Sequence, residues 1–268
     1  MSWHIRPLTV CLSQHTHVMH VTLAVAAAHR RFSAGRSSPS KEELGHWNTA
    51  ISIFRDILNT DWDQQADAAL TTSMFLSMLS FTDASIPHPK SSGVRGLDAS
   101  SFSWFQVQIG LVELITLASI RASSNVIMPY FKDIDPDLSL LHDERSGTEG
   151  IPQALVDLFE VNEFSTCNNH PYLRPLRRIC YMRNIPQTTD NTLKFMQFMQ
   201  GVDMAFVRRL QLLDARAILL LGSWLGFLCH VERWWCKGRA QNEYQAIAAF
   251  LEEHHSCLLP YLRSMTGS

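Results

Sequence analysis

The chain has 268 residues, 46% of them hydrophobic and 18% charged, with a formal net charge of −2. This length and composition allow a large buried core, and the nearly balanced charge argues against a protein that binds nucleic acid through a dense basic patch. The chain has six cysteines, and no two of them form a CxxC motif. They are Cys11, Cys167, Cys180, Cys229, Cys236 and Cys257. In a chain of this length they are typical of reduced core thiols in an intracellular protein.

Apolar residues recur at helical spacing along nearly the whole chain, and no sustained alternation predicts a sheet. The first predicted helix covers about residues 18–32 and ends before the loop sequence GRSSPS. The second starts at a capping box formed by Ser40 and Glu43 and runs to about Asn59. Its core-facing apolar stripe consists of Trp47, Ile51, Phe54 and Leu58.

Further helices are predicted along the rest of the chain, in two groups. A third covers about residues 64–81 and a long one about 102–122, and between them residues 84–100 form a predicted flexible linker. Helical spacing returns at residues 152–163, 172–182, 190–200, 204–213, 214–231, 241–254 and 258–263. The predicted fold is therefore all-α, with residues 1–268 forming a single multi-helix bundle of about ten helices.

The longest apolar run, Ala217 to Cys229, is followed by two adjacent tryptophans. The run is shorter than the ~20 residues that a membrane-spanning helix needs. We therefore expect no membrane span, and we expect Trp234 and Trp235 to form a structural corner that docks the apolar helix against the last two helices.

Sequence signatures of catalysis and cofactor binding are missing. There is no dinucleotide or phosphate-binding loop, no GxSxG elbow and no HExxH motif. The stretch GSWLG, residues 222–226, comes within one residue of the elbow pattern but lies in a helical pattern, so core packing explains it better than catalysis by Ser223. We predict no enzyme activity and no cofactor.

Histidines and acidic residues gather in short clusters. The imidazoles of His15, His17 and His20 do not converge on one point at helical spacing, so a polar helix start is favoured over a metal site. We interpret two further clusters as structural and not as functional sites. His254, His255 and Cys257 lie near a predicted helix end, and Asp133, Asp135 and Asp137 lie in a predicted polar turn. The densest basic stretch, RPLRRICYMR from Arg174, is interpreted as a solvated helix face.

Several stretches together resemble a known family. They are VMHVTLAVAAAHRRF from Val18, KEELGHWNTAISIFRDIL from Lys41, WFQVQIGLVELI from Trp104, and the C-terminal region from Ala215 with its paired tryptophans. In order and spacing they resemble the regulatory region of fungal binuclear zinc-cluster transcription factors, near the sterol uptake control protein subgroup. The resemblance extends over nearly the whole chain.

The chain departs from that family in its cysteines. The family carries, upstream, a cluster of six thiolates that holds two zinc ions and places a basic helix in DNA, and this sequence has no such cluster. We expect no direct sequence-specific DNA binding by the chain and no metal site. It is then either a truncated member or a free-standing regulatory domain that acts through other chains.

The resemblance implies a nuclear location, with a cytoplasmic one as the alternative, and a small apolar effector of sterol-like or lipid-like type. It also implies self-association into a homo-oligomer or contact with other transcription factors. The side chains that could line a pocket for the effector are Met74, Phe75, Met78, Phe105, Ile109, Val112, Leu220, Trp224 and Phe227. Two alternatives are a dimerisation or scaffold module and an all-α enzyme; an enzyme of the terpene cyclase type would need a denser acidic motif than residues 81–85 or 157–163 supply.

Overall fold

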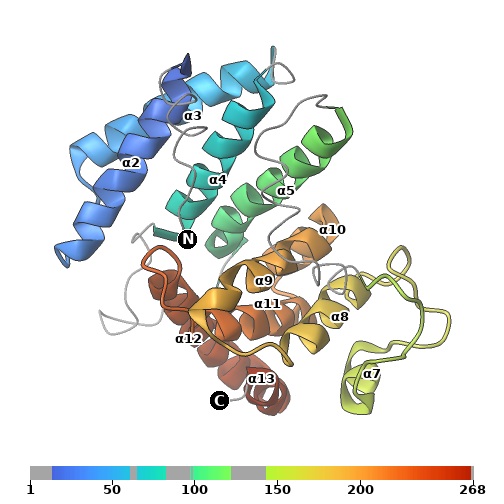
Figure 1. Ribbon diagram of the computed structural model, residues 1–268. Coiled ribbons are helices and arrows are strands. Elements are labelled where there is room, and N and C mark those ends of the chain that lie inside the picture. Colours follow the sequence, from blue (N-terminus) through green and yellow to red (C-terminus); the bar gives the residue numbers. More distant parts are fainter. Residues whose placement is uncertain (1–13, 61–64, 83–96, 98, 122–142, 267–268) are drawn as a thin grey trace. The chain divides into compact units, whose positions relative to one another are not determined.

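The computed structural model describes residues 14–60, 65–82, 97, 99–121 and 143–266. In those ranges the chain forms eleven α-helices and four 3-10 helices and no β-strand (Figure 1). The prediction of an all-α fold is confirmed. The predicted linker falls mostly outside the described ranges.

The chain divides into two compact units. The first comprises Met1–Ser85 and Gly110–Pro136, and the second comprises Ile86–Ile109 and Asp137–Ser268. Helix α5 (Ser103–Arg121) contributes its first half to the second unit and its second half to the first. Each unit has its own buried side chains and is described separately.

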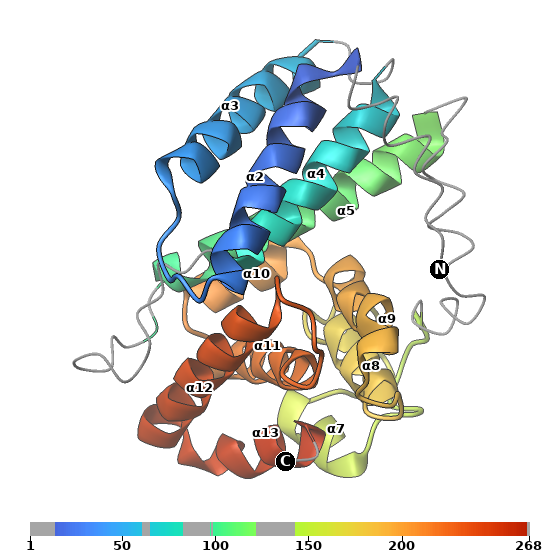
Figure 2. The same ribbon diagram turned by 60° about the vertical axis from the view of Figure 1, so that its left-hand side comes forward.

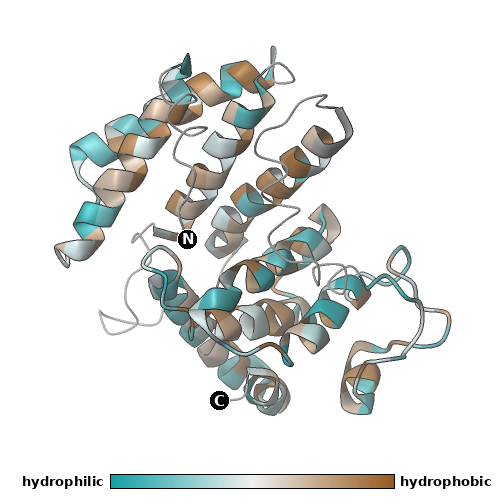
Figure 3. Ribbon diagram, in the orientation of Figure 1, coloured by the Kyte–Doolittle hydropathy of each residue, from teal (hydrophilic) through white to brown (hydrophobic). Residues whose placement is uncertain are grey.

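The first unit is built around α2. Figure 2 shows α2 between α3 and α4, and α2 packs against both. Fully buried alanines, among them Ala24, Ala28 and Ala50, leave room for this close packing. Figure 3 shows hydrophilic and hydrophobic residues side by side on α2 and α3, as expected for helices with one buried face. The bounds are α2 Thr16–Ser33, α3 Lys41–Leu58 and α4 Ala66–Thr82.

Half of the predicted capping box forms at the start of α3. The hydroxyl oxygen of Ser40 accepts a hydrogen bond from the backbone N–H of Glu43 at 3.1 Å. The Glu43 carboxylate turns to α2 instead, where it accepts hydrogen bonds from Arg31 Nε at 3.0 Å and from Arg31 Nη2 at 3.0 Å. The guanidinium also donates to the Thr82 carbonyl at 3.1 Å, so one buried arginine ties three helices together.

The second unit is built around α11, whose residues 217–228 are all buried. It contacts α8, α9, α10, α12 and α13. The indole N–H of Trp224, in the middle of α11, donates to the Phe195 carbonyl at 2.7 Å. Its ring stacks on Phe198 with centroids 5.1 Å apart, and on Trp104 with centroids 6.3 Å apart. The bounds are η1 Ala99–Phe102, α7 Gln153–Phe159, α8 Leu173–Met182, η3 Thr189–Asn191, α9 Thr192–Met196, η4 Gln197–Gly201, α10 Met204–Gln211, α11 Ala215–Leu228, α12 Lys237–His254, η5 Ser256–Leu258 and α13 Leu259–Thr266.

Several helices have bounds that differ from the predicted ones. Helix α7 ends at Phe159 because Glu160 adopts a left-handed conformation with φ of 59°, which stops a helix. The helix predicted over 190–200 is instead η3, α9 and η4, three short pieces. Helix α12 begins at Lys237, a turn before the predicted start, because Arg239 and Ala240 are buried and are held in helical conformation by packing.

The basic stretch on α8 is largely buried, contrary to the interpretation as a solvated face. The Arg177 guanidinium donates to the carbonyls of Glu149 at 2.7 Å and Gly147 at 2.8 Å, and lies 3.3 Å from an oxygen of Asp143. Arg178 lies against Gly201, where an added Cβ would come within 2.3 Å of Arg178 Nε. The loop over residues 143–150 thus wraps around an arginine whose charge it satisfies.

In the part of the chain described, no single helix is both long and apolar enough to cross a membrane. The consecutive helices α10 and α11 meet that test only jointly, and they are bent by 105° at the break between them.

Candidate functional site

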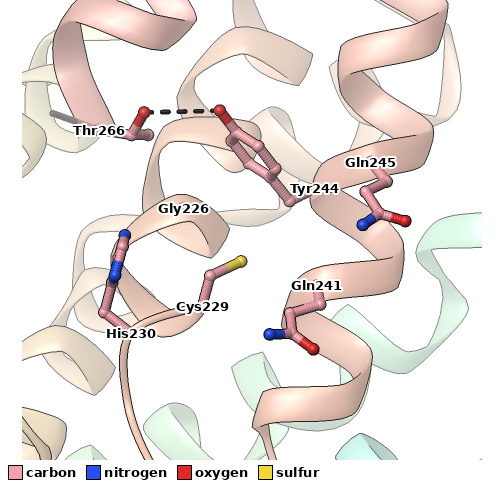
Figure 4. Close-up of a pocket in the computed structure, with 7 residues that line it drawn as sticks. All are labelled: Gly226, Cys229, His230, Gln241, Tyr244, Gln245 and Thr266. Atoms are coloured by element: carbon pink, nitrogen blue, oxygen red, sulfur yellow. Dashed lines mark hydrogen bonds between the residues drawn. The ribbon is translucent and has the colours of Figure 1, made fainter. Parts of the chain in front are cut away.

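A pocket of about 210 Å³ lies within the second unit, where α11, α12 and α13 meet. Figure 4 shows its side chains around one space, three of them on α12 and two just after the end of α11. The lining consists of Gly226, Cys229, His230, Gln241, Tyr244, Gln245 and Thr266. We call this the α11–α13 pocket.

Two glycines of α11 make this meeting of helices possible. Gly222 and Gly226 are four residues apart and so share a face of the helix. A Cβ on Gly222 would lie 2.7 Å from Ile247 Cγ2, and one on Gly226 would lie 2.2 Å from Thr266 Cγ2. Larger residues would push α12 and α13 away, so the GSWLG stretch is explained by packing.

The pocket lining offers hydrogen-bonding groups, among them the imidazole of His230, and contains no carboxylate, lysine or arginine side chain. The Tyr244 hydroxyl lies 3.5 Å from Thr266 Oγ1 at the inner wall, and the Gln241 and Gln245 side chains are exposed at the rim. The nearby ammonium of Lys237 pairs with Glu232. Amides, a phenol and a hydroxyl can both donate and accept, so the lining suits a neutral ligand with polar groups.

The thiol in the pocket is not set up as a nucleophile. Burial raises the pKa of Cys229 to about 11, although the charge of Lys237 opposes the shift. The buried thiol of Cys236 follows the same trend, since burial raises its pKa to about 12. Reactive cysteines instead have lowered pKa values, because the thiolate is the reactive species.

None of the nine predicted pocket residues lines the α11–α13 pocket. In the second unit Phe105, Ile109, Leu220, Trp224 and Phe227 are all buried in the core. Phe105 packs edge-on against Trp224 at 6.1 Å, and Phe227 stacks on Phe195 at 5.7 Å.

The other four predicted residues belong to the first unit, and all are half-buried: Met74, Phe75, Met78 and Val112. The nine side chains thus lie in two units, and a single cavity that they enclose together stays a prediction. The residues that do line the pocket had a signal in the sequence, namely the pair of glycines four apart on α11 followed by a polar face on α12.

The paired tryptophans lie between α11 and α12. Trp234 and Trp235 are both half-buried and stand in the turn just before Lys237. A different tryptophan packs on α12: the guanidinium of Arg239 lies 5.1 Å from the ring centroid of Trp104. The predicted corner is thus the connection that places α12 beside α11.

A buried ion pair between Arg239 and Glu243 lies on the face of α12 opposite the pocket. Each of the two residues is two positions from a pocket glutamine, and two positions along an α-helix correspond to a rotation of more than half a turn. Arg239 Nη1 donates to Glu243 Oε1 at 3.0 Å, and both side chains are almost fully buried. Burial raises the pKa of Glu243 to about 7, while the charge of Arg239 opposes the shift. This pair belongs to the core and not to the pocket.

The histidines near the start of α2 have different partners, although the rings of His15 and His17 pack edge-on with centroids 5.5 Å apart. His15 Nδ1 lies 3.2 Å from Gln65 Oε1, whereas His20 Nδ1 lies 2.8 Å from His46 Nδ1. His17 is buried and packs on Phe54. Over the residues described, no three His, Cys, Asp or Glu side chains are placed to hold a metal ion. The acidic cluster Asp133, Asp135 and Asp137, and Cys11, lie outside the described ranges.

No family model, no curated protein and no solved structure matches the chain.

Proposed function

We propose that the chain is a non-catalytic helical regulatory domain of the fungal zinc-cluster transcription factor type, and that it binds a small effector in the α11–α13 pocket. The observation that carries the binding role is the pocket itself, which has polar groups in its wall and thiols nearby that are held protonated. The assignment to transcriptional control rests on the resemblance of the helical segments and on the all-α fold. The domain acts in the nucleus through other chains.

The size of the pocket bears on the effector. Pockets for drug-sized ligands measure roughly 300–1,000 Å³, whereas this one measures about 210 Å³. A small neutral molecule fits it better than a whole sterol. A sterol-like or lipid-like effector would place only its polar end here, or would occupy a separate site beside the half-buried Met74, Phe75 and Met78 of α4.

The test is a thermal-shift screen of the full chain with nicotinamide, nicotinate and ergosterol. Nicotinamide and nicotinate share a ring and differ in charge, and a ligand that binds only the folded state raises the melting temperature with the logarithm of its concentration. We expect the neutral amide to give the larger shift. We expect Gln245→Trp to abolish that shift by filling the pocket rim, because Gln245 is exposed and lines it.

The matched control is Gln106→Trp, at another exposed glutamine outside the pocket, which should leave the shift unchanged. A shift from ergosterol alone, unaffected by Gln245→Trp, would move the effector site to α4. If none of the three compounds changes the melting temperature of the wild-type chain, the effector-binding proposal is wrong.

A second candidate function is self-association through α3. Leu44, Ile51 and Leu58 lie seven residues apart, on one line of the helix, and are 43%, 44% and 39% exposed. The prediction that Ile51 and Leu58 face the core is therefore wrong, and of the predicted stripe only Phe54 is buried. Antiparallel pairing of two copies about Ile51 would set Leu44 of one copy opposite Leu58 of the other. That self-complementary arrangement is what a two-fold dimer requires.

We expect Ile51→Glu to convert a dimer of the full chain into a monomer, because it places a charge at the centre of the paired surface. The measurement is light scattering after size-exclusion chromatography. Leu212→Glu is the control, since Leu212 is an exposed apolar residue on another helix end, and it should not change the mass. A wild-type chain that is already monomeric at high concentration would exclude this function.

A further inference from the structure

A hydrogen bond between two imidazoles joins α2 to α3 in the first unit. His20 Nδ1 and His46 Nδ1 are 2.8 Å apart, and the ring centroids are 5.1 Å apart. Both side chains are half-buried. A ring nitrogen accepts a hydrogen bond only when it carries no proton, so one histidine donates its Nδ1–H and the other accepts it with a lone pair. The contact therefore requires that at least one of the two rings is neutral.

The helices of the first unit carry further charged and titratable side chains besides these two histidines. They are His15, His17, His29, Arg30 and Arg31 on α2, Lys41, Glu42, Glu43, Arg55 and Asp56 on α3, Asp67 on α4 and Glu113 on α5. The Glu43 carboxylate is engaged by Arg31 at 3.0 Å, and Asp56 pairs with Arg55 at 3.5 Å. On the helix of His46, Glu43 and Asp56 are thus held by arginines, whereas Glu42, four residues before His46, is exposed.

Acid is also expected to destabilise the packing of α2 on α3 through His17. His17 is buried, its Nε2 has no hydrogen-bond partner among the described residues, and its ring packs on Phe54 of α3 at 6.4 Å. Burial, and then the charge of His15, lower the pKa of His17 to about 4 from 6.5. Between those pH values the opened form binds a proton that the packed form does not, so the stability of the packing falls as pH decreases through that window.

We propose that the α2–α3 contact is an acid-sensitive clasp, closed while one of the two facing Nδ1 atoms of His20 and His46 carries a proton and opened when both do. Protonation of both rings would bring two N–H groups and two positive charges to within hydrogen-bond distance, which replaces an attraction by a repulsion. Acid supplies the second proton, so the clasp opens as the pH is lowered. The inference does not depend on effector binding, since it concerns the first unit alone.

Hydrogen exchange of the full chain, followed by mass spectrometry at about pH 7.5 and about pH 5.5 and corrected for intrinsic exchange rates, tests the clasp. We expect the peptides that cover α2 and α3 to exchange several-fold faster at the lower pH, while peptides from α11 change little. In His46→Gln, which keeps a hydrogen-bonding side chain but cannot titrate, the pH-dependent increase should largely disappear, leaving the part due to His17.

His20→Asn provides the second variant, in case His46→Gln does not fold, and should give the same loss of pH dependence. His29→Gln is the control, because His29 is exposed on α2 and should behave as the wild type. The proposal is overturned if α2 and α3 show no faster exchange at the lower pH, or if His46→Gln and His20→Asn both keep the wild-type increase.

Discussion

Replacing Trp224 with alanine is expected to lower the free energy of unfolding of the second unit by about 3–5 kcal/mol. The side chain is fully buried, and its ring packs on Phe198, Trp104 and Phe105. Alanine would leave a cavity among these rings and would also leave the Phe195 carbonyl without its indole donor. The free energy of unfolding of a domain is only about 5–15 kcal/mol, so the variant should lose a large part of its stability. Urea unfolding followed by circular dichroism measures the effect.

Two further substitutions separate packing from hydrogen bonding at this position. Trp224→Phe keeps most of the ring and removes the N–H, and we expect a smaller loss of about 1–3 kcal/mol from the buried carbonyl left without a donor. Leu212→Ala, at a side chain that is 81% exposed, should change stability by less than about 0.5 kcal/mol. A Trp224→Ala chain that unfolds at the wild-type urea concentration would show that this aromatic cluster does not hold the unit together.

The tryptophans are expected to differ in how much each one stabilises the chain. Trp234 and Trp235 attract notice in the sequence because they are adjacent, yet both are half-buried in a turn. Alanine at either position is expected to destabilise the chain less than alanine at Trp224, because less apolar surface returns to water. Which tryptophan is central depends on contacts between segments far apart in the chain, and sequence adjacency does not report those.

Local signals predicted the helices well. The spacing of apolar residues and the Ser40 cap place α3 within a residue or two of its observed ends. The same approach merged η3, α9 and η4 into one helix, since 3-10 turns carry the same apolar spacing over so few residues. Helix existence is encoded locally, whereas irregularity within a helix is decided by packing.

The candidate site could not be predicted from local sequence signals. Its seven residues come from three helices and the turn that follows α11, and only the packing of α12 and α13 on the glycine face of α11 brings them together. Arg177 illustrates the same limit, because an arginine in a basic stretch is normally exposed. It is buried here only because carbonyls from residues 28 or more positions earlier accept hydrogen bonds from its guanidinium group. A hydrogen bond between a buried polar side chain and a distant segment of the chain produces no periodic pattern in the sequence.

Replacing Arg31 with methionine is expected to lower the free energy of unfolding of the first unit by about 3–5 kcal/mol, the range found when one partner of a buried ion pair is removed. The Glu43 side chain is fully buried and Arg31 is 9% exposed. Methionine fills similar space, so the loss would come from a carboxylate left buried without its guanidinium and from the Thr82 carbonyl left without a donor. The measurement is again urea unfolding of the full chain.

The double variant Arg31→Met with Glu43→Leu tests that cause. Replacing both charges by apolar side chains of similar size is often neutral or stabilising, so the double variant should recover most of the stability that Arg31→Met loses. Arg55→Ala is the control, because its pair with Asp56 is about 70% exposed on both sides and exposed pairs contribute about 0–1 kcal/mol. If the double variant is as unstable as the sum of its two single changes, the loss does not come from the unpaired charge, and the arginine then acts through its hydrogen bonds to the carbonyls of Ser37 and Thr82.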